Sequence, residues 1–339
     1  MFEKVLSTIK KYNLIENGDK VVLAVSGGPD SIAMLDILNK IRLENVIKFD
    51  IVVAHINHGL RENAKFDEEY VQEFCKRINV QFFVLHANIK EIAEREKRGL
   101  EETGRNVRYD FFNKVKSEVG ANKIAIAHNA NDNVETIIMN IIRGSGLSGL
   151  KGIEVVSNNY IRPLIEIERV IIEDYCKNEN LNPRHDESND ENIYTRNKIR
   201  NIAIPYIKEE LNPNIVETIT RLSGIAKDDL NYLDLQTENA YKEMCLEEKN
   251  LKNDVYNEDS ESIIILDLKR FNKENVAIQK RVILYSINKI FGTTKGIEKI
   301  HIEDVIKLCN NNIGNKYLTP NKKTKIVIKN KNIIISDVK

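Results

Sequence analysis

Two serines and two glycines follow an apolar run near the start of the chain, and these residue types suit an anion site. Residues 21–25 predict a buried strand, and the amphipathic segment 32–41 predicts a helix. Gly27 and Gly28 allow backbone angles that turn consecutive N–H groups toward one point. The first amides of the helix and its dipole face the same point. We therefore expect phosphate to bind here, although a plain strand-to-helix turn would also require glycine. The expected phosphate-binding residues are Ser26, Gly27, Gly28, Pro29, Asp30 and Ser31.

Strands and helices alternate along the first half of the chain, which predicts an α/β fold with a doubly wound parallel sheet. Strands are expected at 21–25, 49–58, 80–86 and 123–128, and helices at 2–12, 32–41, 62–78, 101–119, 132–142 and 166–179. Ligands of such sheets bind outside the carboxyl ends of the strands. The polar clusters that end the first, second and fourth strands should therefore share one crevice.

A mostly helical α+β domain is expected to follow, because the composition changes near residues 211–214. We place the catalytic domain at 1–211 and a smaller domain at 212–339, joined by a long acidic helix that reaches about Lys249. Further elements are expected at 262–266, 274–291, 300–309, 325–329 and 333–335, the last two forming a hairpin. Lysines gather near this end, at Lys316, Lys322, Lys323, Lys325, Lys329 and Lys331. A protected edge strand and a patch for a phosphate backbone explain them equally well.

Composition excludes several classes of protein. The 51 basic and 51 acidic side chains give a formal net charge of zero, so nothing drives the whole chain toward nucleic acid. No apolar run is long enough for a bilayer, and the first residues resemble an amphipathic helix and not a signal peptide, so we expect a cytoplasmic protein without membrane contact. The cysteines are scattered with no Cys-x-x-Cys pair, so we expect neither zinc nor an iron–sulfur cluster. They are Cys75, Cys176, Cys245 and Cys309.

The segment GSGLSG at 144–149 has the spacing of a dinucleotide-binding fingerprint. That fingerprint needs a strand before it and a helix after it, whereas this segment follows a helical pattern and no clear helix opens before Pro163. We expect a loop at the rim of the crevice.

Seven short motifs, taken in order, resemble those of a known family. They are SGGPDS (26–31), HINHGLR (55–61), EETGRNVRY (101–109), AHNANDNVET (127–136), RGSG (143–146), DESN (186–189) and YTRNKIR (194–200). The first resembles the PP-loop of the N-type ATP pyrophosphatases, which cleave ATP between the α and β phosphates. The whole set resembles one branch, the tRNA(Ile)-lysidine synthetases.

The chain also departs from the family pattern. The family more often has His-His-x-Asp-Asp-Gln-x-Glu-Thr where this chain has Asn129, Asn131 and Asn133. The second Asp, the Glu and the Thr of that pattern match Asp132, Glu135 and Thr136. Many members carry a further carboxyl-terminal domain, and we expect this chain to stop before it.

The resemblance implies an enzyme that ligates L-lysine to C2 of the wobble cytidine in an isoleucine tRNA with a CAU anticodon. ATP adenylates the base, and AMP and pyrophosphate are released as lysidine forms. Two other interpretations stay open. A PP-loop tRNA thiolase would share the ATP site, but thiolases with a catalytic disulfide or cluster need paired cysteines. A nucleotide-dependent RNA-binding module would perform no reaction.

The resemblance also implies roles for single residues. The expected catalytic residues are Asp30, His128, Asp132 and Glu135, and His58 is expected to join the PP-loop at ATP. Mg²⁺ would bind Asp30 and Asp132, although Asp30 could instead be an acid that favours the helix dipole. Together with Glu135, two arginines are expected to hold phosphate or lysine: Arg105 and Arg108. They could equally form surface pairs with Glu101 or Glu102.

The final motif suits contact with the tRNA. It combines an aromatic ring with cationic and amide donors, which fit a splayed anticodon loop, although a helix start with solvated charges has the same composition. The expected tRNA-binding residues are Tyr194, Arg196, Asn197 and Arg200. The expected partners are this tRNA and L-lysine, and a homodimer is one open assembly state.

Overall fold

The computed structural model of the chain describes residues 1–57, 64–184, 194–249, 262–311 and 316–338. The chain forms two compact units, Met1–Ala226 and Lys227–Lys339. Within the described ranges, no helix is both long and apolar enough to cross a membrane.

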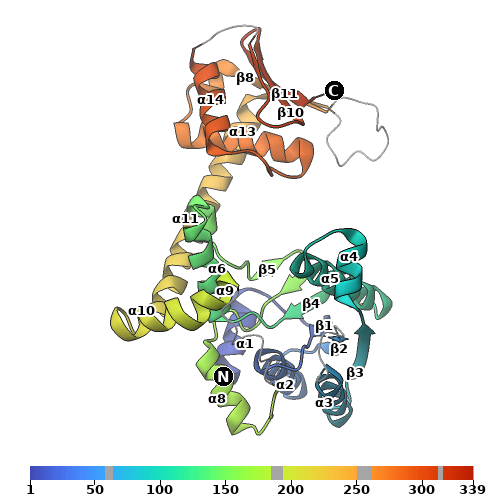
Figure 1. The fold of residues 1–339 in the computed structure, drawn as a ribbon. Helices are drawn as coiled ribbons and strands as arrows, with labels where there is room; N and C mark the ends of the chain where they lie inside the picture. Colours follow the sequence, from blue (N-terminus) through green and yellow to red (C-terminus); the bar gives the residue numbers. More distant parts are fainter. Residues whose placement is uncertain (58–63, 185–193, 250–261, 312–315, 339) are drawn as a thin grey trace. The chain divides into compact units, whose positions relative to one another are not determined.

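The first unit is built on a six-stranded sheet with the strand order β3-β2-β1-β4-β6-β5 (Figure 1). All neighbouring strands are parallel except β5 and β6. The strands are β1 Lys20–Ala24, β2 Asp50–Asn57, β3 Gln81–His86, β4 Lys123–Ile126, β5 Val156–Ser157 and β6 Tyr160–Ile161. The predicted parallel α/β sheet is therefore confirmed.

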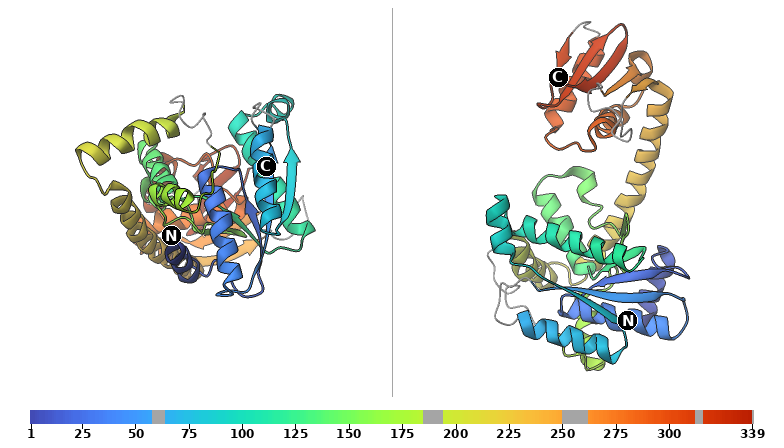
Figure 2. Two further views of the ribbon diagram at one scale, coloured as in Figure 1. Left: turned by 90° about the horizontal axis from the view of Figure 1, so that it is seen from below. Right: turned by 90° about the vertical axis from the view of Figure 1, so that its right-hand side faces the viewer.

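Successive residues of a strand point to opposite faces of the sheet. Both faces carry apolar side chains, and helices cover each of them. Val21 and Leu23 of β1 pack into a core with residues of α1, α2, α3 and α8, while Val22 packs against α5. Figure 1 and the right view of Figure 2 show α3 and α5 on opposite sides of the strands. The helices are α1 Phe2–Lys11, α2 Pro29–Leu43, α3 Ala64–Arg77, α4 Ile89–Glu96, α5 Leu100–Glu118, α6 Ala130–Ile142, α7 Gly146–Gly149, α8 Arg169–Asn178, α9 Thr195–Lys198, the π-helical turn η2 Ile199–Ala203, α10 Ile204–Glu210 and α11 Ile215–Met244.

The structure differs from the predictions in several places, and the short strands β5 and β6 are among the elements that were not predicted. Helix α4 was not predicted, although its buried residues Ile89 and Ala93 are four positions apart and lie on one face of the helix. The expected loop at 144–149 contains the single helical turn α7. The long acidic helix ends at Met244 and not near Lys249, because Cys245–Lys249 pairs with the next strand as β7.

The second unit has an antiparallel sheet with the order β7-β8-β11-β10-β9, packed against α13 and α14. Its elements are β7 Cys245–Lys249, β8 Ile263–Asp267, α12 Leu268–Phe271, α13 Val276–Phe291, α14 Lys299–Asn310, β9 Tyr317–Leu318, β10 Thr324–Lys329 and β11 Asn332–Asp337. The predicted hairpin is confirmed. Its turn residues, Asn330 and Lys331, both have positive φ, as the favoured two-residue turns require.

Candidate active site

The turn between β1 and α2 is held in shape by its own side chains. The Ser31 hydroxyl accepts hydrogen bonds from the amides of Ser26 (3.1 Å) and Gly27 (3.2 Å) and donates to the Gly28 carbonyl (3.0 Å). Gly27 has φ +97°, a conformation that favours glycine. The Gly27 amide and the Ser31 hydroxyl, both expected at phosphate, therefore bind within the loop itself.

Helix α2 begins directly after this turn without a side-chain cap. Gly28 is the N-cap residue and has no side chain to accept from the first-turn amides, and Pro29 occupies the first helical turn. The amides of Asp30 and Ser31 and the positive end of the helix dipole remain as the anion-binding part of the loop. The exposed Ser26 lies at the same turn.

Asp30 connects this turn to the carboxyl end of β4, the neighbour of β1 in the sheet. The Asn129 side-chain amide donates to one Asp30 carboxylate oxygen, Oδ1, at 2.9 Å. Burial raises the pKa of Asp30 to about 6, and the nearby charge of Asp132 adds to the rise. The sheet thus brings together two carboxylates that are 102 positions apart in the chain, as the strand-end argument predicts.

Asn129 is a site residue that the motif comparison set aside. Its side-chain oxygen accepts from the Asp132 backbone N–H at 3.0 Å, and its own backbone N–H donates to Asp132 Oδ2 at 3.1 Å. This capping box starts α6 at the position that orients Asp132. The signal that could have identified it is Asn followed three residues later by an acid, just before an apolar helix.

Asn129→Ala should destabilise the protein by about 1–2 kcal/mol, because the helix loses its cap and Asp30 loses a donor. Asn129→Ser is the matched variant, since serine keeps the cap but cannot reach Asp30. Urea unfolding should place the serine variant close to the native protein. Equal losses for both variants would show that the contact to Asp30 dominates and the cap does not.

Asp132 and Glu135 lie one turn apart on α6 and share two arginines. Arg196 donates to Glu135 Oε2 at 2.7 Å and to Asp132 Oδ1 at 3.1 Å. Arg200 donates to Glu135 Oε1 at 2.5 Å and to Asp132 Oδ1 at 2.9 Å. Glu135 is only 1% exposed, and a carboxylate at that depth requires such partners. Residues expected at tRNA and residues expected in catalysis therefore form one ion-pair cluster.

The remaining residues of the last motif differ in exposure. Tyr194 is 62% exposed and is the N-cap residue of α9, and Asn197 lies within α9. Arg200 lies in η2, and π-helical turns are frequent at functional sites. The DESN motif and His58 fall outside the described residues.

His128 stands two residues after β4, beside the PP-loop strand. Ala24 of β1 pairs with Ile126 of β4, so His128 and Ser26 follow neighbouring strand ends. The Arg162 side chain donates from Nε to His128 Nδ1 at 3.1 Å. Burial lowers the pKa of His128 to about 4, so the imidazole is neutral at pH 7.

Arg105 and Arg108 lie exposed on α5. The Arg105 guanidinium lies 5.2 Å from the centre of the Tyr109 ring, and Arg108 Nε donates to the Gly104 carbonyl at 3.2 Å. No described carboxylate comes within 4.0 Å of either guanidinium, so the alternative pairs with Glu101 and Glu102 are not formed here.

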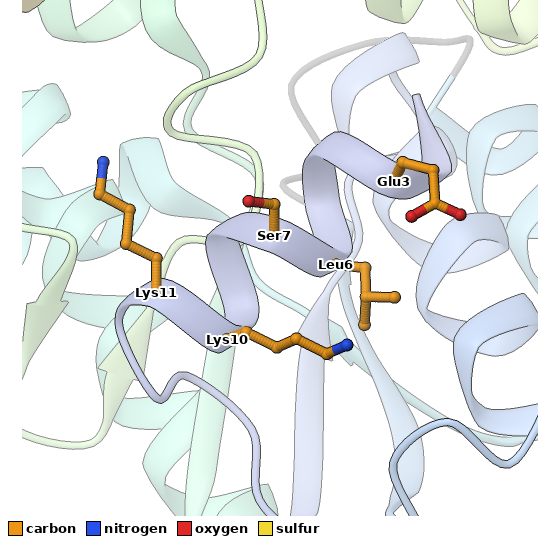
Figure 3. A pocket seen from close by; sticks show the side chains of 5 residues that line it. All are labelled: Glu3, Leu6, Ser7, Lys10 and Lys11. Atoms are coloured by element: carbon orange, nitrogen blue, oxygen red, sulfur yellow. The ribbon is translucent and has the colours of Figure 1, made fainter.

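A hollow of about 350 Å³ adjoins the ion-pair cluster and carries both signs of charge. Among the residues that line it are Asn131, Glu135, Arg169, Glu173 and Arg200. A larger hollow of about 480 Å³ lies along α1 (Figure 3). Among the described residues, those that line it all belong to α1: Glu3, Leu6, Ser7, Lys10 and Lys11. Hollow size therefore does not identify the site, whereas the gathered strand-end residues do.

Comparison with known proteins agrees with the motifs. Residues 1–207 match the family model described as a PP-loop domain. The tRNA(Ile)-lysidine synthase of Clostridioides difficile (strain 630) is 42% identical over 100% of this chain and 72% of its own length. That of Caldanaerobacter subterraneus subsp. tengcongensis is 41% identical over 94% of this chain and 66% of its own length. The chain belongs to the tRNA(Ile)-lysidine synthase family.

This chain spans about two thirds to three quarters of the length of those two synthases. Among solved structures, the U34-tRNA thiolase NcsA from Methanococcus maripaludis is similar, with a TM-score of 0.52 and 20% identity. The match covers 66% of this chain and 78% of that one. At this identity the likeness concerns the fold alone.

None of the four cysteines, all of which the structure describes, forms a disulfide. Cys75, Cys176 and Cys309 are buried, and Cys245 is half-buried. Burial raises the pKa of Cys75 to about 12 and that of Cys176 to about 11. These thiols stay protonated at neutral pH, which makes them weak nucleophiles.

Proposed function

We propose that this protein ligates L-lysine to C2 of the wobble cytidine in a CAU-anticodon isoleucine tRNA and thereby forms lysidine. The observation that carries this proposal is the 42% identity over 100% of the chain to a tRNA(Ile)-lysidine synthase. ATP adenylates the base, and the products are lysidine, AMP and pyrophosphate.

The reaction needs ATP because the C2 oxygen of cytosine is a poor leaving group. That oxygen attacks the α-phosphate, the bond to pyrophosphate breaks, and AMP becomes the group attached to the base. The lysine ε-amine then forms the new bond at C2 and displaces AMP, losing a proton. The protein must therefore hold pyrophosphate, the base and an amine close together.

The β1–α2 turn is the proposed site for the outer phosphates of ATP. The first-turn amides of Asp30 and Ser31 supply fixed donors where charge develops on the leaving pyrophosphate. Ser26 is exposed beside them, and its hydroxyl lies 3.2 Å from the Ser31 hydroxyl. In our proposal the Gly27 amide and the Ser31 hydroxyl keep the loop in shape and do not contact phosphate directly.

Mg²⁺ fits at Asp30. Within the described chain, the second carboxylate oxygen of Asp30 has no hydrogen-bond partner, and both oxygens of Asp132 already have donors. The raised pKa of Asp30 reflects a carboxylate that a nearby cation would stabilise in its charged form. Mg²⁺ commonly uses one or two protein carboxylates together with substrate phosphates. Asp30 would hold it, and Asp132 would join only if Arg196 and Arg200 released it. The ion would neutralise charge on the phosphates.

Lysine fits the hollow of mixed charge beside Glu135. Glu135 and Glu173 could bind ammonium groups, and Arg169 and Arg200 could bind the carboxylate, once lysine displaced the ion pairs that these side chains form with one another. Arg105 and Arg108, exposed on α5, remain proposed contacts for phosphate or for the lysine carboxylate.

The tRNA is proposed to contact both units. Tyr194 offers an exposed ring for stacking on a base. In the second unit, the exposed Lys325 and Lys329 lie on β10, and the Lys325 ammonium lies 5.6 Å from the Tyr317 ring centre. For Arg196 and Arg200 to contact tRNA as well, they would have to leave Asp132 and Glu135.

We also propose that the protein is located in the cytoplasm, where tRNA is modified. A homodimer is one open assembly state, and light scattering would measure it.

Incorporation of labelled lysine into a CAU-anticodon tRNA transcript tests the proposal. We expect label in the tRNA and release of pyrophosphate only when ATP, lysine and this transcript are all present. A transcript with a different anticodon is the matched control. Sulfur transfer without lysine incorporation would instead support a thiolase. Binding of ATP and tRNA with no pyrophosphate release would support a non-catalytic RNA-binding module.

A further inference from the structure

Arg162 is a buried cation with only neutral partners. It follows β6 and is 7% exposed. Its Nη1 donates to the Glu154 carbonyl at 2.6 Å, its Nε donates to His128 Nδ1 at 3.1 Å, and the Tyr109 hydroxyl lies beside it. Within the described ranges, no carboxylate forms an ion pair with it. The charge of Glu154 favours the guanidinium only from beyond ion-pair distance. A cation held this deep without a paired carboxylate is costly, which points to a role beyond packing.

The contact to His128 fixes which ring nitrogen carries the proton. Arginine can only donate hydrogen bonds, so Nδ1 must accept and cannot be protonated. A neutral imidazole has one proton, which therefore lies on Nε2. In the part of the chain that the structure describes, Nε2 has no hydrogen-bond partner. His128 is thus able to offer an N–H group at the end of β4.

Burial favours the same uncharged state of His128, and the surrounding charges act in both directions. Arg162, Arg196 on α9 and Arg105 on α5 oppose a charge on His128, whereas Asp132 on α6 favours one, and burial outweighs all of them. The imidazole is therefore neutral before any substrate binds.

We propose that Arg162 is a positioning residue that holds His128 as a neutral Nε2–H donor toward an anionic oxygen of the bound nucleotide. This inference rests on the proposed function, because it is the ATP reaction that supplies that oxygen. It also specifies the role of His128: the ring donates a hydrogen bond and does not accept a proton from lysine.

Three substitutions separate the two properties of Arg162. Arg162→Lys keeps a cation and a donor, Arg162→Gln replaces the cation with a neutral amide that can either donate or accept, and Arg162→Met keeps neither property. Nitrogen NMR of ¹⁵N-histidine-labelled protein at pH 7.5 reports the tautomer, and the chain has only six histidines to assign. The native protein and the lysine variant should both show a protonated Nε2 and a bare Nδ1 for His128. The glutamine variant should show more of the other tautomer, because its side-chain oxygen can accept from Nδ1–H. The methionine variant should show a mixture of both tautomers.

Kinetics should follow the tautomer. We expect Arg162→Met to lower kcat for lysine incorporation about 10- to 100-fold, as loss of an orienting partner does at other sites, with KM for lysine little changed. The lysine variant should lose much less. His128→Gln, which keeps an N–H donor, should retain more activity than His128→Phe.

Either of two results would overturn the inference. One is a protonated Nδ1 on His128 in the native protein, which is measured without any variant. The other is a methionine variant that keeps the Nε2–H tautomer and full kcat. The NMR result does not depend on catalysis, so a protein that failed to incorporate lysine would contradict the proposed function while the tautomer was still measured.

Discussion

Asp30→Asn should make the ligand-free protein more stable at pH 7.5 and at the same time abolish lysine incorporation. The pKa of Asp30 is raised to about 6, mainly by burial and also by the charge of Asp132. The folded state therefore binds more protons than the unfolded state between about pH 4 and pH 6. Stability from this group is present below pH 4 and is lost as pH rises through that window.

The asparagine variant removes this ionisation and keeps the oxygen that accepts from Asn129. At 1.36 kcal/mol per pKa unit, the expected gain at pH 7.5 is about 1–3 kcal/mol. At pH 4 the two proteins should differ in free energy of unfolding by less than about 0.5 kcal/mol, because Asp30 is then protonated in the folded state and only about half ionised in the unfolded state.

Urea unfolding at pH 4 and pH 7.5 measures this difference. Asp50→Asn is the control, since Asp50 is exposed at the amino-terminal end of β2, away from the strand ends that form the crevice. It should change stability by less than about 0.5 kcal/mol at either pH. A destabilised Asp30→Asn protein at pH 7.5 would contradict the raised pKa.

With Mg²⁺ and ATP bound, the native protein should become more stable than the Asp30→Asn variant. Mg²⁺ with ATP should stabilise the native protein, which can offer a carboxylate, more than the asparagine variant. We expect loss of at least about 100-fold in lysine incorporation, since Asp30 is the proposed Mg²⁺ ligand. Equal stabilisation of both proteins by Mg²⁺ and ATP would place the ion elsewhere.

The sequence predicted the parts of the site that local pattern determines. An apolar run followed by polar residues marks a strand end, and parallel strands place their carboxyl ends at one edge. That reasoning brought Asp30 and Asp132 together, and the structure confirms that they are close. The helix prediction was wrong at 245–249, where pairing with β8 outweighs the helical pattern.

The ion pairs could not be predicted in this way. Arg196 and Arg200 each contact Glu135 from more than 60 positions further along the chain, and no periodicity encodes such a contact. Exposed and buried charges look alike in a sequence. Asn129 was missed for a different reason, because it was compared with a family motif and not considered as a helix cap.

Glu135→Gln should strongly destabilise the protein, because it leaves two guanidinium groups with Asp132 as their only carboxylate partner in the cluster. Glu135 is 1% exposed, and the Arg200 and Arg196 side chains are 21% and 39% exposed. Removing one partner of a fully buried pair costs about 3–5 kcal/mol. Partial exposure of the arginines reduces the expected loss to about 2–4 kcal/mol.

Glu173→Gln is the matched control. Glu173 accepts from Arg169 Nε at 2.9 Å, but its side chain is 49% exposed, so its loss should cost less than about 1 kcal/mol. Raising the salt concentration should weaken the Glu173 contribution and leave the buried Glu135 contribution almost unchanged. Similar losses and similar salt dependence for the two variants would mean that water reaches the Glu135 cluster. In that case Arg196 and Arg200 would separate from the acids at little cost, and lysine or tRNA could replace them without a large change in stability.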